Sequence, residues 1–264
     1  MLVVQNIAKT FNPGTVNEKP ALSNLSLELK EGDYVTVIGG NGSGKSTLLN
    51  CIAGVYEVDQ GSIFVDQADL TRCSEHKRAR VLGRVFQDPM AGTTATMSIE
   101  ENLALAARRG TRRGLAWGTG FKERKRFKEA LKVLGLGLEQ RLSTPVGLLS
   151  GGERQALTLL MATLKKPKLL LLDEHTSALD PKTAVKVLAL SDAVIRENGL
   201  TALMVTHNMR DAINYGNRLI MMHEGSIVLD IKGEAKRKLT VEYLFNRFGE
   251  ISGEEFAHGR ALLA

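Results

Sequence analysis

The stretch Gly39-Gly40-Asn41-Gly42-Ser43-Gly44-Lys45-Ser46 decides the fold, because it matches the pattern GxxxxGK[ST] in full. It follows the apolar run Tyr34–Ile38, which predicts a buried strand, and it leads into Ser46–Ala53, which has helical spacing. Glycines let backbone N–H groups turn toward an anion, and the start of a helix adds the positive end of its dipole. Strand, loop and helix together predict a phosphate-binding loop and argue against a glycine-rich turn that binds nothing.

Two side chains of this loop carry chemistry of their own. Lys45 is suited to place a positive charge on the β- and γ-phosphates of a nucleotide, and the Ser46 hydroxyl is suited to ligate Mg²⁺. We therefore predict that the segment binds the phosphates of a nucleotide together with Mg²⁺. The predicted binding residues are Gly39, Gly40, Asn41, Gly42, Ser43, Gly44, Lys45, Ser46 and Thr47.

Composition indicates a globular chain in a reducing compartment. Of the 264 residues, 43% are hydrophobic and 24% charged, which is close to the average of soluble domains. The net charge of +6 is compatible with nucleic acid, an anionic membrane surface or phosphate ligands, and selects none of them. Cys51 and Cys73 form no CxxC pair, so neither a disulfide framework nor a zinc site is expected.

The sequence predicts no secretory signal and no membrane span. Residues Met1–Asn6 turn polar too early for a signal peptide. No apolar run approaches the roughly 18 residues that a bilayer requires. If the protein works at a membrane, we expect another chain to supply the spanning part.

Further apolar runs extend the prediction to an α/β fold with a mostly parallel core sheet. Leu169–Leu172 and Ala202–Val205 are short and end in polar residues, which is typical of buried parallel strands. Thr183–Arg196 has helical spacing between them. Such alternation of strands and helices favours a doubly wound arrangement.

Two other regions have strands of a different kind. Leu2–Ile7 and Leu25–Leu29 alternate apolar and polar residues with turn residues between them, which predicts an N-terminal antiparallel group. Leu219–Met222 and Ile227–Leu229 are joined through Glu224-Gly225 and read as a late hairpin.

We predict a single domain over residues 1–264 with three parts. The core covers about 1–89 and 149–231, an inserted helical subdomain covers about 90–148, and a charged, mostly helical tail covers about 232–264. The subdomain has candidate helices at Ile99–Arg109 and Phe121–Leu134. The basic, glycine-rich Gly110–Gly120 between them holds Trp117 and is expected to be a mobile or partner-facing loop.

Two carboxylates follow the four leucines that end at Leu172. Asp173 is expected at the carboxyl end of the strand, where it organises Mg²⁺, and Glu174 is expected to orient the attacking water. Alone the pair also fits a solvated turn, but beside a phosphate-binding loop it predicts nucleotide hydrolysis.

The segment Leu149-Ser150-Gly151-Gly152-Glu153 narrows the interpretation to one family. Ser150 and Glu153 form the capping-box pattern S-x-x-E before a predicted helix Gln155–Leu164, and a capped helix start suits a phosphate. The segment also resembles the signature of the ABC (ATP-binding cassette) family, which implies the P-loop fold of that family. Ser150, Gly151, Gly152 and Glu153 are then expected to contact nucleotide.

The resemblance assigns further residues in chain order. Phe11 lies where related proteins stack an aromatic ring on adenine. Gln87 resembles the Q-loop glutamine that touches Mg²⁺, and Asp180 closes a segment that looks like the D-loop. His207 resembles the switch histidine that contacts the γ-phosphate and, with Glu174, is expected to be catalytic. The metal ligands implied are Ser46, Gln87 and Asp173.

The resemblance also implies partners. It predicts a head-to-tail homodimer in which the signature segment covers ATP bound by the other chain. It implies membrane permease subunits, a substrate-binding protein, and a peripheral position on the cytoplasmic face of the membrane. The chain looks like the ATPase subunit of an importer of a small molecule such as an amino acid, and no nucleic acid is expected. The alternatives are an exporter or lipoprotein-extracting ATPase, and a soluble ABC ATPase that drives assembly of another complex.

One residue departs from the family pattern. Family members usually carry proline after the acidic pair, and this chain has His175, which restores backbone freedom and an N–H donor. We expect altered loop geometry or a titratable group close to the site. Histidine here is similar to one subgroup of importer ATPases linked with aromatic amino acid uptake.

Overall fold

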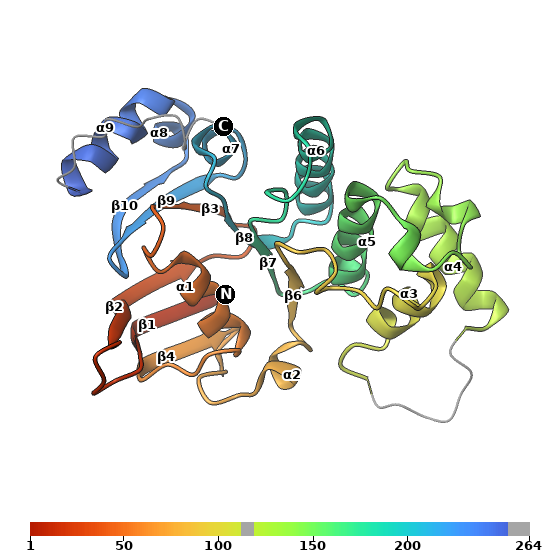
Figure 1. The fold of residues 1–264 in the computed structure, drawn as a ribbon, viewed down its shortest axis with the longest axis horizontal. Helices are drawn as coiled ribbons and strands as arrows, with labels where there is room; N and C mark the ends of the chain where they lie inside the picture. The colour runs from red at the N-terminus through yellow and green to blue at the C-terminus, as the bar shows by residue number, and fades with distance from the viewer. Residues whose placement is uncertain (112–118, 253–264) are drawn as a thin grey trace. The chain divides into compact units, whose positions relative to one another are not determined.

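The computed structural model describes residues 1–111 and 119–252, and this part of the chain divides into two compact units (Figure 1). Unit 1 combines Met1–Arg78 with the segment that begins at Leu200, and unit 2 is Ala79–Gly199. The predicted limits of the helical subdomain, 90–148, remain a prediction. The segment 110–120, with Trp117, lies mostly outside the described residues.

Unit 1 contains a four-stranded antiparallel sheet in the order β2-β1-β4-β5. Its strands are β1 (Leu2–Phe11), β2 (Lys19–Leu29), β4 (Gln60–Val65) and β5 (Ala68–Asp69). Leu2, Val4 and Ile7 of β1 are buried, and Val4 pairs with residues of both neighbouring strands. The predicted antiparallel group is confirmed.

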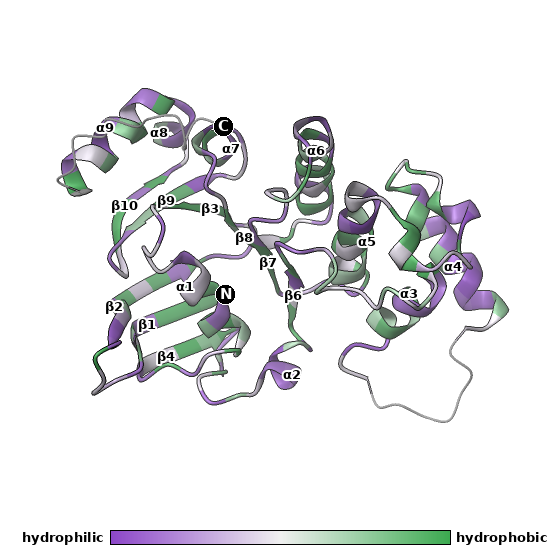
Figure 2. Cartoon of the chain, viewed as in Figure 1, coloured by the Kyte–Doolittle hydropathy of each residue, from purple (hydrophilic) through white to green (hydrophobic). Residues whose placement is uncertain are grey.

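The other strands of unit 1 run in the order β10-β9-β3-β8. They are β3 (Tyr34–Ile38), β8 (Thr201–Val205), β9 (Arg218–His223) and β10 (Ser226–Lys232). β3 pairs in parallel with both β8 and β9, whereas β10 is antiparallel to β9. Every residue of β3 and β8 is buried, and Figure 2 shows these strands as hydrophobic. Burial on both faces explains why their sequences are continuous apolar runs.

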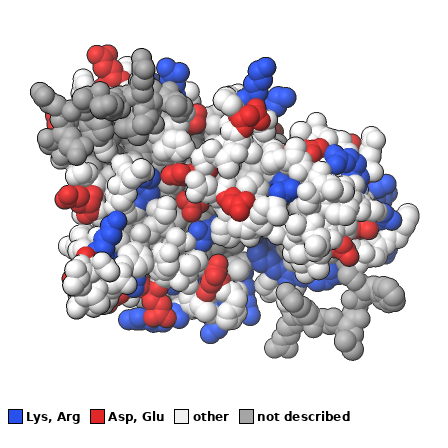
Figure 3. Space-filling model, viewed as in Figure 1, with Lys and Arg blue, Asp and Glu red and all other residues white. Residues whose placement is uncertain are grey.

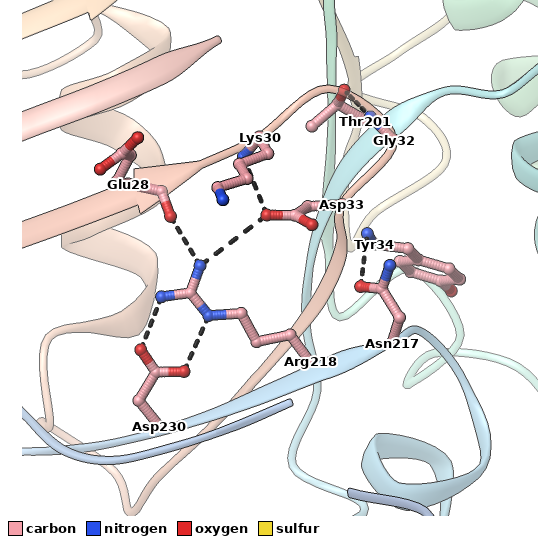
Figure 4. A network of polar contacts seen from close by, with 9 residues as sticks. All are labelled: Glu28, Lys30, Gly32, Asp33, Tyr34, Thr201, Asn217, Arg218 and Asp230. Atoms are coloured by element: carbon pink, nitrogen blue, oxygen red, sulfur yellow. Dashed lines mark hydrogen bonds and ion pairs between the residues drawn. The ribbon is translucent and has the colours of Figure 1, made fainter. Parts of the chain in front are cut away.

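Arg218 of β9 joins separate segments of unit 1 through one guanidinium group (Figure 4). Its Nε and Nη2 donate to the two carboxylate oxygens of Asp230 at 2.7 and 2.6 Å. Its Nη1 donates to the carbonyl of Glu28 at 2.6 Å and lies 3.9 Å from the carboxylate of Asp33. The end of β2, the turn before β3, and the β9–β10 hairpin are therefore held together.

The helices of unit 1 are α1 (Lys45–Ala53), α2 (Glu75–Arg78), α7 (Met209–Asn214), α8 (Glu234–Arg237) and α9 (Val241–Ser252). Arg78 is 2% exposed and donates from Nη1 to the carbonyls of Cys51 and Ile52 at 2.6 and 2.8 Å. Because the last carbonyls of a helix have no partner within it, Arg78 caps the end of α1.

Unit 2 has one parallel strand pair and a set of helices. The strands are β6 (Leu82–Val85) and β7 (Leu169–Asp173). The helices are α3 (Ile99–Ala107), α4 (Phe121–Lys132), α5 (Gly151–Thr163) and α6 (Pro181–Glu197), with short 3-10 turns at Leu138–Gln140 and Val146–Leu148. Phe127 and Leu131 of α4 are buried in a cluster with α3 and α5. The rest of α4 is largely hydrophilic, as Figure 2 shows.

Among the described residues, we find no helix that combines the length and the apolar character needed to cross a bilayer.

Candidate functional site

In unit 1 the predicted phosphate loop connects the end of β3 to the start of α1. Gly39 has φ 153° and Gly44, the N-cap of α1, has φ 97°. A Cβ at Gly39 would lie 2.3 Å from the carbonyl oxygen of Met222, and one at Gly44 would lie 2.5 Å from that of Ala21. Glycine is required at both positions by backbone conformation and by the close approach of another strand.

The Lys45 side chain folds back over this loop. It is 7% exposed, and its Nζ donates to the carbonyls of Gly39 and Gly40 at 2.8 and 2.9 Å. A buried ammonium needs hydrogen-bond acceptors, and these carbonyls supply them. The charge is thereby fixed on the loop itself, where a phosphate group would need it.

Other polar groups of the loop fit a phosphate ligand. Within the described part of the chain, the Ser43 hydroxyl is buried and lacks a hydrogen-bond partner. The helix α1 begins at Lys45, so the first N–H groups of its opening turn have no acceptor within the helix. Donors without internal acceptors, together with the helix dipole, favour an anion at this end of α1.

Phe11, the predicted adenine-stacking residue, lies at the end of β1. Its ring makes an edge contact with Tyr56, with 5.2 Å between ring centroids and 82° between ring planes. Lys9 Nζ lies 5.9 Å from the centre of the Phe11 ring. Tyr56, which follows α1, is therefore a second aromatic residue at this position that the sequence analysis missed.

His207, the predicted switch histidine, lies in the short connection between β8 and α7. Asn208 fixes the start of α7, because its side chain accepts hydrogen bonds from Arg210 N and Asp211 N at 2.9 and 3.2 Å. Burial raises the pKa of the Asp211 carboxyl, and the nearby charge of His207 opposes that shift. The histidine thus follows a buried strand and precedes a capped helix.

In unit 2 the predicted acidic pair lies at the end of β7: Asp173 is the last residue of the strand and Glu174 follows it, and each carboxylate has its own partner. The Asp173 side chain is 14% exposed, and Arg84 Nη2 lies 3.3 Å from its Oδ2. Glu174 has φ 42°, a left-handed conformation that is uncommon outside glycine. Strained backbone is frequent at functional positions.

Gln87 and Glu174, predicted from separate motifs, lie together in the structure. Gln87 Nε2 donates to Glu174 Oε2 at 3.4 Å and to Ser177 Oγ at 3.1 Å. The Ser177 hydroxyl donates to the carbonyl of Glu174 at 2.9 Å. The glutamine that follows β6 therefore contacts the loop that follows β7, as expected for parallel neighbouring strands.

His175 is buried rather than facing solvent. It is 2% exposed, and its Nε2 lies 2.9 Å from the hydroxyl of Ser191 on α6. Burial lowers the pKa of His175 to about 4. The side chain connects the loop after β7 to the middle of α6.

The signature segment forms the start of α5 with a complete capping box. The Ser150 hydroxyl accepts from Glu153 N at 3.3 Å, and Glu153 Oε2 accepts from Ser150 N at 2.8 Å. Burial alone raises the pKa of Glu153, but the hydrogen bonds from Ser150 and the charge of Arg141 outweigh it and leave the pKa lowered. The next helix, α6, has Asp180 as its N-cap, and the Asp180 side chain accepts from Thr183 N at 3.1 Å.

The structure adds three residues to the predicted set: Tyr56, Arg84 and Ser191. Arg84 stands inside a short apolar strand, a position unusual for arginine, and that was the one available signal in the sequence. Tyr56 and Ser191 have ordinary sequence contexts, and only the fold brings them to Phe11 and His175.

Together, a phosphate loop that opens a helix, two carboxylates after a buried strand and a capped LSGGE helix define a nucleotide-hydrolysing ATP-binding cassette. A family model described as ABC transporter matches residues 22–177, and the chain belongs to this family. It is the ATP-binding subunit of an ABC transporter and an ATPase.

Relatives with transport functions are similar over most of the chain. A tyrosine transport ATP-binding protein of Clostridioides difficile is 44% identical, over 94% of this chain and 98% of the relative. The methionine import ATP-binding protein MetN of Mannheimia succiniciproducens is 32% identical, over 97% of this chain and 73% of the relative.

Solved structures of ATP-binding cassettes share the fold. A dimeric post-hydrolysis state of the cassette MJ0796 bound to ADP and Pi has a TM-score of 0.75 at 30% identity, and covers 88% of this chain and 98% of that one. The ADP conformation of the cassette MJ1267 has a TM-score of 0.76 at 26% identity, and covers 96% of this chain and 99% of that one.

Proposed function

We propose that this chain drives import of an amino acid, tyrosine or a close analogue, through a separate membrane permease. The observation that carries the proposal is the 44% identity to a tyrosine transport ATP-binding protein over 98% of that protein's length. His175 after the acidic pair adds support, because the chain resembles at this position a subgroup of importer ATPases linked with aromatic amino acid uptake. The chain works at the cytoplasmic face of the membrane, where the permease and a substrate-binding protein complete the transporter.

The roles of the nucleotide-contacting residues follow from their chemistry. Lys45 and the loop amides bind the β- and γ-phosphates, and Phe11 stacks on adenine. Glu174 orients the attacking water, and His207 stabilises the charge of the γ-phosphate. Gln87, hydrogen bonded to Glu174 at 3.4 Å, links that carboxylate to the Q-loop, which in related proteins also senses the membrane partner.

The residues available for Mg²⁺ fit a hard cation. Ser46, Gln87 and Asp173 offer hydroxyl, amide and carboxylate oxygens, which Mg²⁺ prefers. Mg²⁺ commonly takes one or two protein carboxylates beside phosphate oxygens and water, so this small set is sufficient. When bound, the cation neutralises charge on the phosphates. Arg84, 3.3 Å from Asp173, orients that carboxylate.

Two chains are proposed to bind ATP together as a head-to-tail dimer. Ser150, Gly151 and Gly152 start a capped helix, whose opening N–H groups suit the γ-phosphate bound by the other chain. Cleavage of that phosphate removes the shared ligand, and the dimer opens. The dimeric state of the related cassette MJ0796 supports this arrangement.

Three variants of the purified chain test the roles at the nucleotide. Glu174→Gln is expected to lose at least about a hundredfold in ATPase rate while ATP affinity is kept, because the carboxylate acts on the water. Lys45→Ala is expected to weaken ATP binding itself. Glu224→Gln is the matched control, since Glu224 is also left-handed, at φ 44°, and its side chain is 87% exposed. Normal turnover in Glu174→Gln, or unchanged ATP affinity in Lys45→Ala, would contradict the assignment.

The transport proposal is tested by what the chain binds in its host. The tagged chain is purified from membranes in mild detergent, and co-purifying proteins are identified. The expected result is that a polytopic permease co-purifies. When this chain and the permease are reconstituted together, tyrosine and its binding protein should stimulate the ATPase activity of the complex. If only soluble assembly factors co-purify, the transport role is wrong although the ATPase stands.

A further inference from the structure

The C-terminal helix α9 is built into unit 1 through two side chains of one face. Leu244 and Phe248 are four residues apart, one helical turn, and are 0% and 6% exposed. They enter an apolar cluster together with Ile38, Met209, Ala212, Leu219 and Met221. Ile38 is the last residue of β3, so the cluster reaches the point where the phosphate loop begins.

Phe248 itself lies against the phosphate loop. If Gly40 carried a Cβ, the three atoms nearest to it would all belong to the Phe248 ring, with Cζ at 3.0 Å. The His223 ring meets Phe248 edge-on, with centroids 6.2 Å apart and 88° between planes. The first turn of the loop is therefore enclosed by the Met222 carbonyl at Gly39 and by the Phe248 ring at Gly40.

We propose that Phe248 is a positioning residue for ATP binding, and that α9 forms the supporting wall of the phosphate loop. The inference rests on the proposed role of the loop and of Lys45. Lys45 is hydrogen bonded to the carbonyls of Gly39 and Gly40, so the placement of this turn also sets the placement of the lysine charge. A ring that holds the turn in place lowers the ordering cost of binding phosphate.

A pair of variants on α9 separates this role from general packing. Phe248→Ala and Leu244→Ala both remove buried side chains from the same cluster, and both should lower the thermal midpoint of the full chain. Affinity for a fluorescent ATP analogue is then measured by titration. We expect Phe248→Ala to raise the Kd about five- to tenfold, because the loop loses its preorganisation. Leu244→Ala should leave the Kd within about twofold. Phe248→Leu, which retains bulk beside Gly40, should recover most of the affinity.

A second pair tests the contact directly. Gly40 does not have a positive φ, so its backbone conformation does not disfavour alanine. The effect of Gly40→Ala should therefore come from steric contact, because the added methyl would lie 3.0 Å from the Phe248 ring. Gly40→Ala should weaken ATP binding, and the double variant Gly40→Ala with Phe248→Ala should bind no more weakly than Phe248→Ala alone.

The outcomes distinguish this inference from the proposed function. Equal Kd changes in Phe248→Ala and Leu244→Ala, or additive losses in the double variant, would overturn the positioning role while ATP binding by the loop stands. If Phe248→Ala does not fold, Gly40→Ala decides: wild-type ATP affinity in that variant, whose added methyl would lie 3.0 Å from the Phe248 ring, would overturn the positioning role. Wild-type ATP affinity in Lys45→Ala would instead remove the proposed role of the loop.

Discussion

At the scale of single residues, the hydrogen bonds around His175 fix its protonation. A serine hydroxyl has one hydrogen, and Ser191 donates it to the carbonyl of Val187 at 2.8 Å. The 2.9 Å contact between Ser191 Oγ and His175 Nε2 must therefore be donated by the ring. With a pKa of about 4, the imidazole is neutral near pH 7 and carries its proton on Nε2. The titratable group expected at this position is therefore neutral near pH 7, and its ring ties the loop after β7 to α6.

This burial predicts a pH dependence of stability. The folded pKa of His175, about 4, lies below the ordinary value of 6.5, so the unfolded chain binds more protons between these values. The free energy of unfolding should therefore fall as pH drops from 6.5 toward 4, by up to about 1.4 kcal/mol per pH unit, and be insensitive to this group above 6.5. Urea unfolding at pH 5 and pH 7.5 measures the effect. In His175→Gln the difference between the free energies of unfolding at pH 5 and pH 7.5 should be smaller than in the unsubstituted chain. An unchanged difference would exclude His175 as its source.

At the scale of elements, the sequence predicted strand centres and helix faces better than their ends. Continuous apolar runs such as Leu169–Leu172 favour buried strands, whereas β6 was given no bounds because Gly83 and Arg84 interrupt its apolar run. The helix expected from Gln155 begins at Gly151, because the capping box of Ser150 and Glu153 outweighs the poor helix propensity of two glycines.

For the candidate site, the sequence predicted the motifs but not the contacts between them. Motif spacing located the loop and the acidic pair, because each lies within one short segment. The contacts of Gln87 with Ser177, 90 residues away, and of Arg84 with Asp173, 89 residues away, depend on how strands pair in space. Periodicity and propensity carry no information about such distances. The assigned roles of these residues remain predictions.

An element-scale prediction concerns the cap on α1. Arg78 donates to four carbonyls, those of Cys51, Ile52, Thr71 and Cys73. Lysine keeps the charge but is a single point donor that cannot span these four groups. Arg78→Lys should lower the free energy of unfolding by about 2–3 kcal/mol, since buried acceptors lose partners.

The matched control for the cap is Arg72→Lys. The Arg72 side chain is 70% exposed and pairs with Glu57 at 3.5 Å on the surface, so its change should stay within about 0.5 kcal/mol. Denaturant unfolding of both variants decides the matter. Equal effects of the two substitutions would show that Arg78 does not cap α1.

At the scale of the whole molecule, charge is dispersed on the face shown in Figure 3, where Lys and Arg alternate with Asp and Glu. The net charge of +6 is modest for 264 residues. An interspersed surface of this kind favours solubility over binding to a polyanion.

The predicted dimer belongs to this scale. Glu174→Gln should accumulate as a species of twice 28.8 kDa in light scattering after chromatography with ATP and Mg²⁺, because the shared γ-phosphate is not cleaved. Without nucleotide, or with ADP, the same variant should elute at the mass of one chain. Ser150→Arg, which places a bulky cation on the signature segment, should abolish the dimer while each chain still binds ATP. A nucleotide-independent dimer would contradict the shared-ligand arrangement.

The discontinuity of unit 1 has a consequence for the protein during its own synthesis. Strand β3 is buried along its whole length, yet its partners β8 and β9 begin only at Thr201 and Arg218. At the usual ~5–20 residues per second, a ribosome needs roughly ten to forty seconds to add that intervening chain. Throughout this interval the apolar strand β3 lacks both of the strands with which it pairs. Nascent chains stalled near residue 190 should therefore be captured by chaperones that bind exposed apolar segments, and release should come only when β9 has emerged.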